Sequence, residues 1–251
     1  MDAIQAVLLG VLQGITEWIP ISSEGQTMLV MMKWLGVSPT EALSYSILLH
    51  IGTMAAVLIR FRGEFVDALK NIDSRMTRIL VISTVCTGIT GLPLYFLFKE
   101  SFSGGREATL LIGTLLILTG LLLRFKGSGS RKFEDMKTTD MIILGLAQGF
   151  SILPGVSRSG TTLTLLLMRN IRQDVALIIS FMISVPAVLG AVVLDHSIAA
   201  VPLGSAALAI LASFITGYLS MGLLIRFAEK VNFSRFCIAM GLVTLVLSSL
   251  F

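Results

Sequence analysis

Long apolar runs alternate with short charged loops along almost the whole chain. Six of these runs are long enough to cross a bilayer as helices, which takes about 20 mostly apolar residues. They cover residues 43–60, 79–98, 108–123, 176–194, 203–225 and 236–251. The pattern therefore predicts an all-α integral membrane protein with six transmembrane helices.

Two further apolar regions are interrupted by proline and polar residues. Residues 3–19 lead through a Ser-Ser-Glu-Gly-Gln stretch into a short apolar piece, 27–35. Residues 139–153 lead through a Ser-Arg-Ser-Gly-Thr-Thr stretch into another short piece, 163–168. Broken backbone at membrane depth is tolerated only where it is buried in protein or lines a cavity. We therefore interpret both regions as re-entrant helical hairpins.

The two hairpins resemble each other in sequence. LLGVLQGITEWIPISSEGQT (8–27) and ILGLAQGFSILPGVSRSGTT (143–162) share Gly-x-x-Gln-Gly and, further on, Pro-x-x-Ser. Repeats of opposite orientation form a known membrane architecture, with the binding site at their interface near the midplane. We predict a single membrane domain, 1–251, with an inverted-topology repeat. Its first copy covers about 1–126 and its second about 138–251, joined by a basic cytoplasmic loop.

Composition and charge agree with this topology. The chain is 55% hydrophobic and 14% charged, whereas a soluble domain carries roughly 25% charged residues. Fifteen of the nineteen Lys and Arg residues fall in loops on one predicted side, at 60–78, 124–137, 169–172 and 226–235. Positive charge marks cytoplasmic loops. We expect a multi-pass protein of the plasma membrane whose partners are the membrane and a lipid, with no nucleic acid, and we leave a homodimer open.

The second hairpin carries the densest polar signal, PGVSRSGTT. Arg158 lies where a helix is expected to begin, and a helix start offers unpaired N–H groups and a positive dipole end to an anion. The guanidinium fork matches phosphate oxygens. An arginine at membrane depth costs on the order of 3 kcal/mol, so it usually has a partner or a function. The predicted phosphate-binding residues are Ser157, Arg158, Ser159, Gly160, Thr161 and Thr162. The alternative is a helix cap in which Arg158 reaches the interface or pairs with Glu17.

The first hairpin supplies different groups. Gln13 and Glu17 share a helix face, and a carboxylate within the membrane suits a cation or a proton. Ser22 and Ser23 either cap the next helix or provide, in Ser23, a nucleophile towards phosphorus. A serine hydroxyl needs an adjacent base for that role. The candidate bases are Glu17, Glu24 and His50, although His50 fits a helix–helix hydrogen bond equally well. Trp18 and Trp34 are expected to anchor this hairpin at the membrane interface.

LLGVLQGITEWIPISSEGQ and LPGVSRSGTT resemble the two signature regions of the bacitracin-resistance type of undecaprenyl-diphosphate phosphatase. The resemblance covers essentially the whole chain, including EALSYSILLHIGTMAAVLIRF after the first motif. It implies hydrolysis of a long polyprenyl diphosphate to the monophosphate, which recycles the lipid carrier for cell-wall or glycan assembly. It also implies dependence on a divalent cation, Mg²⁺ or Ca²⁺, and a pocket that opens to the outer face.

The resemblance also implies roles for single residues. Glu17 is similar to the family's second acidic position, which handles metal or phosphate, and Ser23 to its proposed nucleophile. Ser157, Arg158 and Thr162 resemble the residues that grip the diphosphate. The chain departs from the family pattern at Gln13, in place of the first acidic residue, and at Gln26, in place of a histidine.

Glu24 is an extra carboxylate beside the serine, and we hypothesise that Glu24 or His50 takes over the role of base. The first tip is expected to bind substrate through Gln13, Ser22 and Gln26, and a metal through Glu17. Inverted repeats with broken helices are also a transporter architecture. A lipid-phosphate transporter or flippase that binds the lipid without cleaving it is therefore the alternative function.

Overall fold

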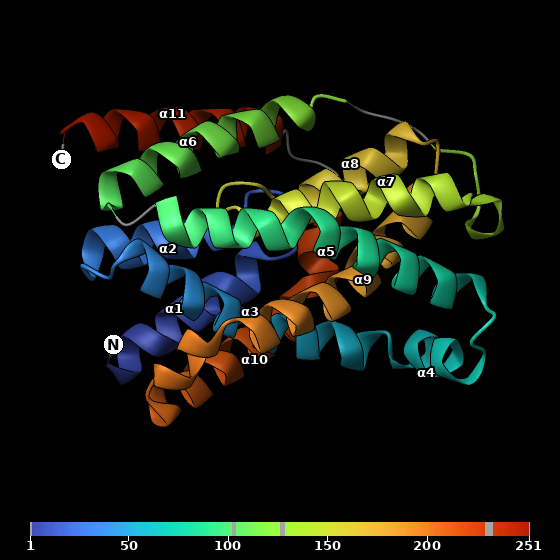
Figure 1. Ribbon diagram of the computed structural model, residues 1–251, viewed down its shortest axis with the longest axis horizontal. Coiled ribbons are helices and arrows are strands. Elements are labelled where there is room, and N and C mark those ends of the chain that lie inside the picture. Colours follow the sequence, from blue (N-terminus) through green and yellow to red (C-terminus); the bar gives the residue numbers. More distant parts are fainter. Residues whose placement is uncertain (1, 102–103, 126–128, 229–232, 251) are drawn as a thin grey trace.

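The computed structural model describes residues 2–101, 104–125, 129–228 and 233–250. Within these ranges the regular structure is helical, apart from an isolated backbone bridge between Arg131 and Ile171 (Figure 1). This confirms the predicted all-α fold. The α-helices are α1 (Ala3–Thr16), α2 (Ser23–Trp34), α3 (Pro39–Arg60), α4 (Arg62–Lys70), α5 (Arg75–Ser101), α6 (Gly105–Leu122), α7 (Thr138–Gly149), α8 (Arg158–Met168), α9 (Gln173–Leu194), α10 (Leu203–Ala228) and α11 (Phe233–Leu250). Three short 3-10 helices are η1 (Phe133–Asp135), η2 (Phe150–Ile152) and η3 (His196–Ala200).

Five helices of the described chain are long and apolar enough to cross a membrane, namely α3, α5, α6, α9 and α10. They make the chain a multi-pass membrane protein. The sixth predicted span, 236–251, belongs to α11, whose described apolar part counts among the shorter helices, as does α1. Residue 251 and two lysines of the predicted cytoplasmic loops, Lys126 and Lys230, lie outside the described residues. Helix α4 occupies part of the stretch 60–78, which the charge pattern had marked only as a loop.

Local signals in the sequence account for where α3 begins, and prolines lie inside two other long helices. Ser38 and Glu41 form a capping box at the start of α3, with Pro39 in its first turn. Pro is tolerated there because its missing N–H has no helical partner. By contrast, Pro93 lies inside α5 and Pro186 inside α9. An interior proline removes a backbone hydrogen bond, yet α5 and α9 each continue through it as a single helix.

Both predicted hairpins occur as broken helices. Helix α1 ends before a turn that leads into α2, and α7 ends before η2 and a turn that lead into α8. Helices α2 and α8 have 12 and 11 residues, and at 1.5 Å per residue each is far shorter than the roughly 30 Å of a bilayer core. Each hairpin therefore ends inside the protein.

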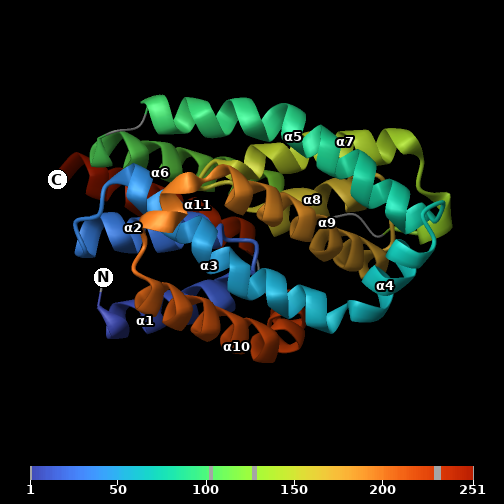
Figure 2. The ribbon, with the colours of Figure 1, turned by 60° about the horizontal axis from the view of Figure 1, so that its bottom comes forward.

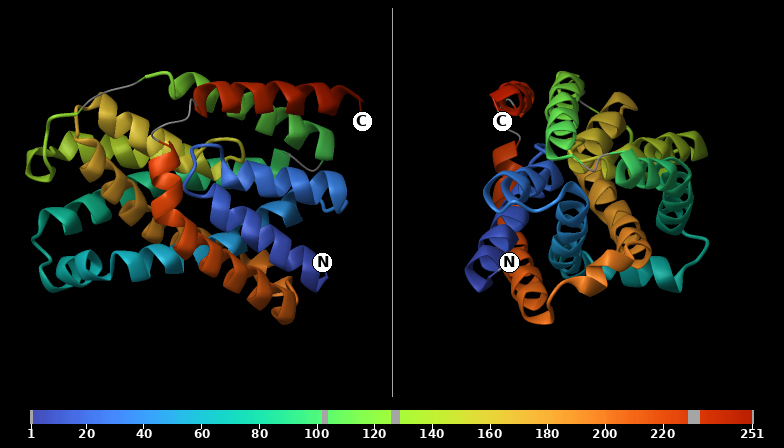
Figure 3. Two further views of the ribbon diagram at one scale, coloured as in Figure 1. Left: turned by 180° about the vertical axis from the view of Figure 1, so that it is seen from behind. Right: turned by 60° about the vertical axis from the view of Figure 1, so that its left-hand side comes forward.

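Small residues let the first arm of each hairpin pack closely against a long helix. Helix α1 lies along α10, where a Cβ on Gly14 would come within 2.6 Å of the Gly217 nitrogen. Helix α7 lies along α5, where a Cβ on Gly149 would come within 2.7 Å of the Gly91 nitrogen. Helices α6 and α11 form a third close pair at the other side of the molecule (Figures 1 and 3). The hairpin tips are thus held between packed helix pairs.

Helices α3 and α9 run next to each other through the middle of the molecule, between α10 and α5 (Figure 2). Trp18 belongs to this interior. Its side chain is 3% exposed, its Nε1 donates to the Gly217 carbonyl at 3.0 Å, and its ring meets Phe181 edge-on at 5.3 Å. The prediction of an interfacial anchor was wrong for Trp18, because the end of α1 enters the core. Trp34 is 82% exposed, and its anchoring role remains a prediction.

Candidate active site

The tips of the two hairpins touch, although 133 residues separate them. The Ser22 hydroxyl caps α2 by accepting from the Gly25 N–H at 3.3 Å, and it also accepts from the Gly155 N–H at 3.0 Å. Ser22 adopts a positive φ of 59°, which is unusual for a residue with a side chain. A Cβ on Gly25 would lie 3.0 Å from the Gly155 nitrogen, so the two turns approach as closely as glycine allows.

The second tip is fixed from the other side by α6. The Thr119 hydroxyl donates to the Gly155 carbonyl at 3.1 Å and accepts from the Ser157 N–H at 3.3 Å. Ser157 in turn caps α8 through the Gly160 N–H at 3.1 Å. Two helix starts, of α2 and α8, are thereby placed next to each other. Their free N–H groups and dipole ends make the space between them suitable for an anion.

Glu17 is the centre of the polar cluster at this junction. Its carboxylate, on a residue only 5% exposed, is paired through Oε1 with Arg158. Its other oxygen, Oε2, accepts from the Ser23 hydroxyl at 2.6 Å and from the Gln13 amide at 2.9 Å. The candidate nucleophile is therefore hydrogen-bonded directly to a buried carboxylate, which is the arrangement that serine activation requires.

Arg158 reaches this carboxylate from the first turn of α8. Its Nη1 also donates to the Ser180 carbonyl on α9 at 3.1 Å, and its guanidinium lies 6.0 Å from the centre of the Phe181 ring. These contacts fix the direction of the side chain. A guanidinium has five N–H donors, so the pairing with Glu17 and Ser180 leaves donors for an incoming phosphate.

His50 approaches the cluster from α3. Its Nδ1 lies 2.7 Å from the Ser46 carbonyl, and its Nε2 lies 3.3 Å from Glu17 Oε2. Both partners can only accept hydrogen bonds, so both ring nitrogens are placed to donate. Only a doubly protonated, positively charged imidazole can donate to both partners at once. The Ser23 hydroxyl donates to Glu17 and not to His50. His50 therefore has the position of a proton donor.

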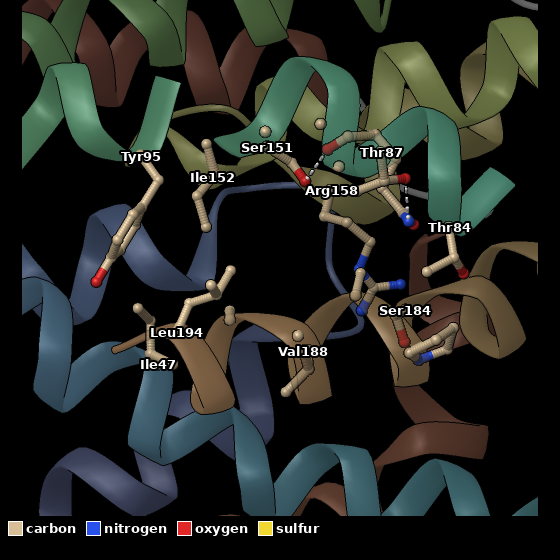
Figure 4. Close-up of a pocket in the computed structure, with 18 of the residues that line it drawn as sticks. Ile47, Thr84, Thr87, Tyr95, Ser151, Ile152, Arg158, Ser184, Val188 and Leu194 are labelled. Atoms are coloured by element: carbon tan, nitrogen blue, oxygen red, sulfur yellow. Dashed lines mark hydrogen bonds between the residues drawn. The ribbon is translucent and has the colours of Figure 1, made fainter. Parts of the chain in front are cut away.

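Two adjoining cavities meet at these residues. The smaller, of about 30 Å³, is polar and lies between the tips. The larger, of about 240 Å³, is mostly apolar and lies between α3, α5 and α9 (Figure 4). Among the described residues, the lining shared by both consists of Glu24, His50, Ser151 and Arg158. Glu24 Oε1 is buried and has no hydrogen-bond partner, so a carboxylate oxygen is available where the cavities join.

The structure brings most of the predicted site residues together. The small cavity is lined by Glu17, Ser22, Ser23, Glu24, His50, Ser157, Arg158 and Ser159. Gln13 lies behind Glu17. Gln26 donates to the Ile21 carbonyl at 3.3 Å and lines neither cavity.

The remaining residues of the second motif support the tip from behind. The Thr162 hydroxyl donates to the Arg158 carbonyl at 2.8 Å and lies 2.6 Å from the Ser180 hydroxyl. Gly160 leaves room for the first tip, since a Cβ there would lie 3.1 Å from Pro20 Cβ. The Thr161 hydroxyl is buried without a partner. Their predicted contacts with substrate stay predictions.

Sequence reasoning missed two serines of the site. Ser151 lines both cavities, and Ser180 supplies the carbonyl that positions Arg158. Ser180 and Ser184 stand four residues apart in the apolar run of α9 and share a helix face. Such a polar pair within a predicted span was the available signal.

The residues around Glu17 offer few ligands for the predicted metal ion. Both oxygens of Glu17 are engaged by protein groups, and two of its neighbours, the Arg158 guanidinium and the His50 ring, are placed to donate hydrogen bonds to it. In the part of the chain that the structure describes, no three His, Cys, Asp or Glu residues are grouped so that they could hold a metal ion. The protein groups alone do not fit a divalent cation at Glu17.

The sequence matches a known family of membrane proteins over most of its length. Residues 6–246 match the family model described as bacitracin resistance protein BacA. The chain is 59% identical to an undecaprenyl-diphosphatase of Methanothrix thermoacetophila, over 100% of this chain and 98% of the relative. It is 41% identical to one of Methanopyrus kandleri, over 96% and 94%, and 34% identical to one of Alkaliphilus metalliredigens, over the full length of both. All three relatives are named as phosphatases, which gives the transporter alternative no support.

Proposed function

The chain belongs to the bacitracin resistance protein BacA family, and from this starting point we propose that it hydrolyses a long-chain, undecaprenyl-like polyprenyl diphosphate. The products are the polyprenyl monophosphate and inorganic phosphate, and the reaction recycles a lipid carrier. The observation that carries the proposal is the Ser23–Glu17–Arg158 cluster at two adjoining helix starts. It combines an activated hydroxyl with a site for a phosphate inside a membrane protein.

The first step is attack by Ser23 Oγ on the terminal phosphorus. Its proton passes to Glu17 Oε2, which already accepts that hydrogen bond at 2.6 Å. The bond between the terminal phosphorus and the bridging oxygen breaks, and the electron pair leaves on the polyprenyl monophosphate. Arg158 and the N–H groups of α2 and α8 stabilise the charge that develops on the phosphoryl oxygens.

The second step is hydrolysis of the phosphoserine. Water attacks the phosphorus and the bond to Ser23 Oγ breaks. Oγ takes back the proton that Glu17 Oε2 accepted in the first step, and inorganic phosphate departs. Glu24 is the group placed to take the proton from this water, because its Oε1 is buried without a protein partner beside the cavity. His50, with donors on both ring nitrogens, supplies positive charge to the same space.

These different roles predict different effects of substitutions at Glu24 and His50. Glu24→Gln is expected to slow phosphate release by about a hundredfold, because general-base catalysis contributes about 10²–10⁴-fold. It should let phosphoserine accumulate at Ser23, detectable by rapid quenching and mass spectrometry of the peptide. His50→Ala is expected to lower the rate without accumulation. Unchanged rates in both variants would show that neither residue takes part in proton transfer.

The helix pairing supports an inverted repeat built from six spans and two hairpins. Helix α1 of the first half packs on α10 of the second, while α7 of the second half packs on α5 of the first. The first arm of each hairpin thus packs on a long helix of the other half, and α6 packs on its counterpart α11. The repeats, 1–126 and 138–251, then form one membrane domain. The distribution of Lys and Arg supports a plasma-membrane orientation in which the site opens to the outer face.

The function is tested by supplying purified protein in detergent with a polyprenyl diphosphate. Release of inorganic phosphate together with the polyprenyl monophosphate is the expected result. Mg²⁺, Ca²⁺ and then a chelator are added to the same reaction, since dependence on a divalent cation is a separate prediction. Loss of activity with chelator would support a cation brought in with the diphosphate. Absence of phosphate release under every condition would contradict the proposed function.

A further inference from the structure

The larger cavity has a lining that protein packing does not explain. One face of α5, with positions three or four residues apart, contributes Thr84, Gly88, Gly91, Leu92 and Tyr95. The facing side of α9 contributes Ser184, Ala187, Val188, Gly190, Ala191 and Leu194 (Figure 4). Most of these side chains are small and apolar. The two helices therefore leave a slot between them instead of filling it.

Two glycines in this lining have no close protein neighbour. A Cβ on Gly190 would have nothing within 4 Å, and a Cβ on Gly88 would meet only Leu92 of its own helix, at 4.0 Å. Gly91 differs, because a Cβ there would lie 3.5 Å from Gly149 Cα and its small size serves helix packing. A glycine in a helix interior costs about 1 kcal/mol relative to alanine. At Gly88 and Gly190 that cost is not offset by a close helix contact.

The slot ends at the phosphate site. Arg158, Glu24 and His50 line its polar end, and Glu24 Oε1 lies there without a hydrogen-bond partner. Its other boundary faces outward, since two residues of the lining, Leu92 on α5 and Leu194 on α9, are 38% and 41% exposed. In a multi-pass membrane protein such apolar positions face lipid. The slot therefore connects a charged end with the edge of the bilayer, and a ligand with an anionic head and an apolar chain matches both.

We propose that the isoprene units next to the diphosphate lie in this slot, and that Gly88 and Gly190 keep it wide enough for their methyl branches. The proposal rests on the proposed function and names the part of the protein that recognises the chain. At about 240 Å³, the slot falls below the roughly 300–1,000 Å³ of a pocket for a drug-sized ligand. It therefore holds only the first units, and the rest of a long chain extends between α5 and α9 into lipid.

The test compares two substrates in purified full-length variants. Gly190→Leu is expected to lower kcat/KM for undecaprenyl diphosphate by about tenfold or more, since a change of one methylene in an apolar pocket already alters kcat/KM by about 10–200-fold. Isopentenyl diphosphate, with a single isoprene unit, should be affected by less than about threefold. Gly88→Leu, on the opposite helix, should act in the same direction. Gly222→Leu is the matched control, because Gly222 on α10 also has open space around its Cβ but lines neither cavity.

The outcomes separate this inference from the proposed function. If the wild type releases no phosphate from either diphosphate, the proposed function fails and the inference fails with it. If the wild type is active but both slot variants behave like Gly222→Leu on the long substrate, the slot does not hold the chain and the function stands. An equal loss on both substrates in both slot variants would also overturn the inference, because it would reflect damage to the phosphate site.

Discussion

Arg158→Ala is expected to lower kcat/KM for the polyprenyl diphosphate by about a thousandfold, with lipid binding lost as well. Removal of one preorganised donor to a developing anion costs about 10²–10³-fold, and Arg158 offers several donors at once. The substitution also leaves Glu17 as a buried carboxylate without its arginine partner, which adds repulsion towards the phosphate. Phosphate release and equilibrium binding of the lipid measure the two effects separately.

Arg158→Lys tests the geometry of the same contact. A lysine keeps the charge but cannot donate from a planar fork to Glu17, Ser180 and a phosphate together, so most of the loss should remain. Arg172→Ala is the matched control, because Arg172 forms an exposed pair with Asp174 at 2.7 Å, and such pairs contribute little. Normal activity in Arg158→Ala, with unaltered elution on size exclusion, would disprove the role of Arg158 as phosphate ligand.

Ser23→Ala is expected to lower kcat by at least about a thousandfold while the lipid still binds. Removing a serine nucleophile from a hydrolase that uses one can cost about 10⁶-fold in kcat. The binding groups Arg158 and the two helix starts are untouched, so the dissociation constant of the lipid should change little. This combination, binding without turnover, distinguishes Ser23→Ala from Arg158→Ala. Ser205→Ala, at an exposed hydroxyl on α10, is the control.

Retention of most activity in Ser23→Ala would contradict attack by the serine itself. It would then favour direct attack by a water molecule held by Glu17 and Glu24. The absence of any phosphoserine in the quenched Glu24→Gln reaction would point in the same direction. Both measurements therefore test whether Ser23 or water attacks the phosphorus, whereas the Arg158 variants test the phosphate site.

The hydrophobic pattern predicted the helical fold and both broken hairpins because bilayer thickness sets the length of a span. The same pattern began the last helix at residue 236, whereas α11 begins at Phe233, and it left α4 as a loop, since helix ends depend on local packing and capping. Trp18 shows a further limit. An aromatic residue after an apolar run resembles an interfacial anchor, and only the tertiary contact with Gly217 and Phe181 reveals it as part of the core.

The sequence predicted most residues of the site but few of the contacts between them. Glu17, Ser23 and Arg158 stood out as polar groups at membrane depth, and the resemblance of the two motifs placed them at facing tips. The position of His50 depends on how α3 crosses the cluster, which no local pattern specifies. Ser180 and Ser184 mark a polar face of α9, but no sequence pattern shows that the Ser180 carbonyl accepts from Arg158. At the departure Gln13, the side-chain amide donates to Glu17 at 2.9 Å, a hydrogen bond that an ionised carboxylate at this position could not donate.

The most direct measurement is inorganic phosphate released from undecaprenyl diphosphate by the purified wild type and by Arg158→Ala, assayed in parallel with lipid binding. The account predicts phosphate and undecaprenyl monophosphate in equal amounts from the wild type, with neither binding nor release in the variant. Lipid binding by the wild type without any phosphate release would contradict it and would identify a protein that retains the phosphate site but does not hydrolyse the lipid.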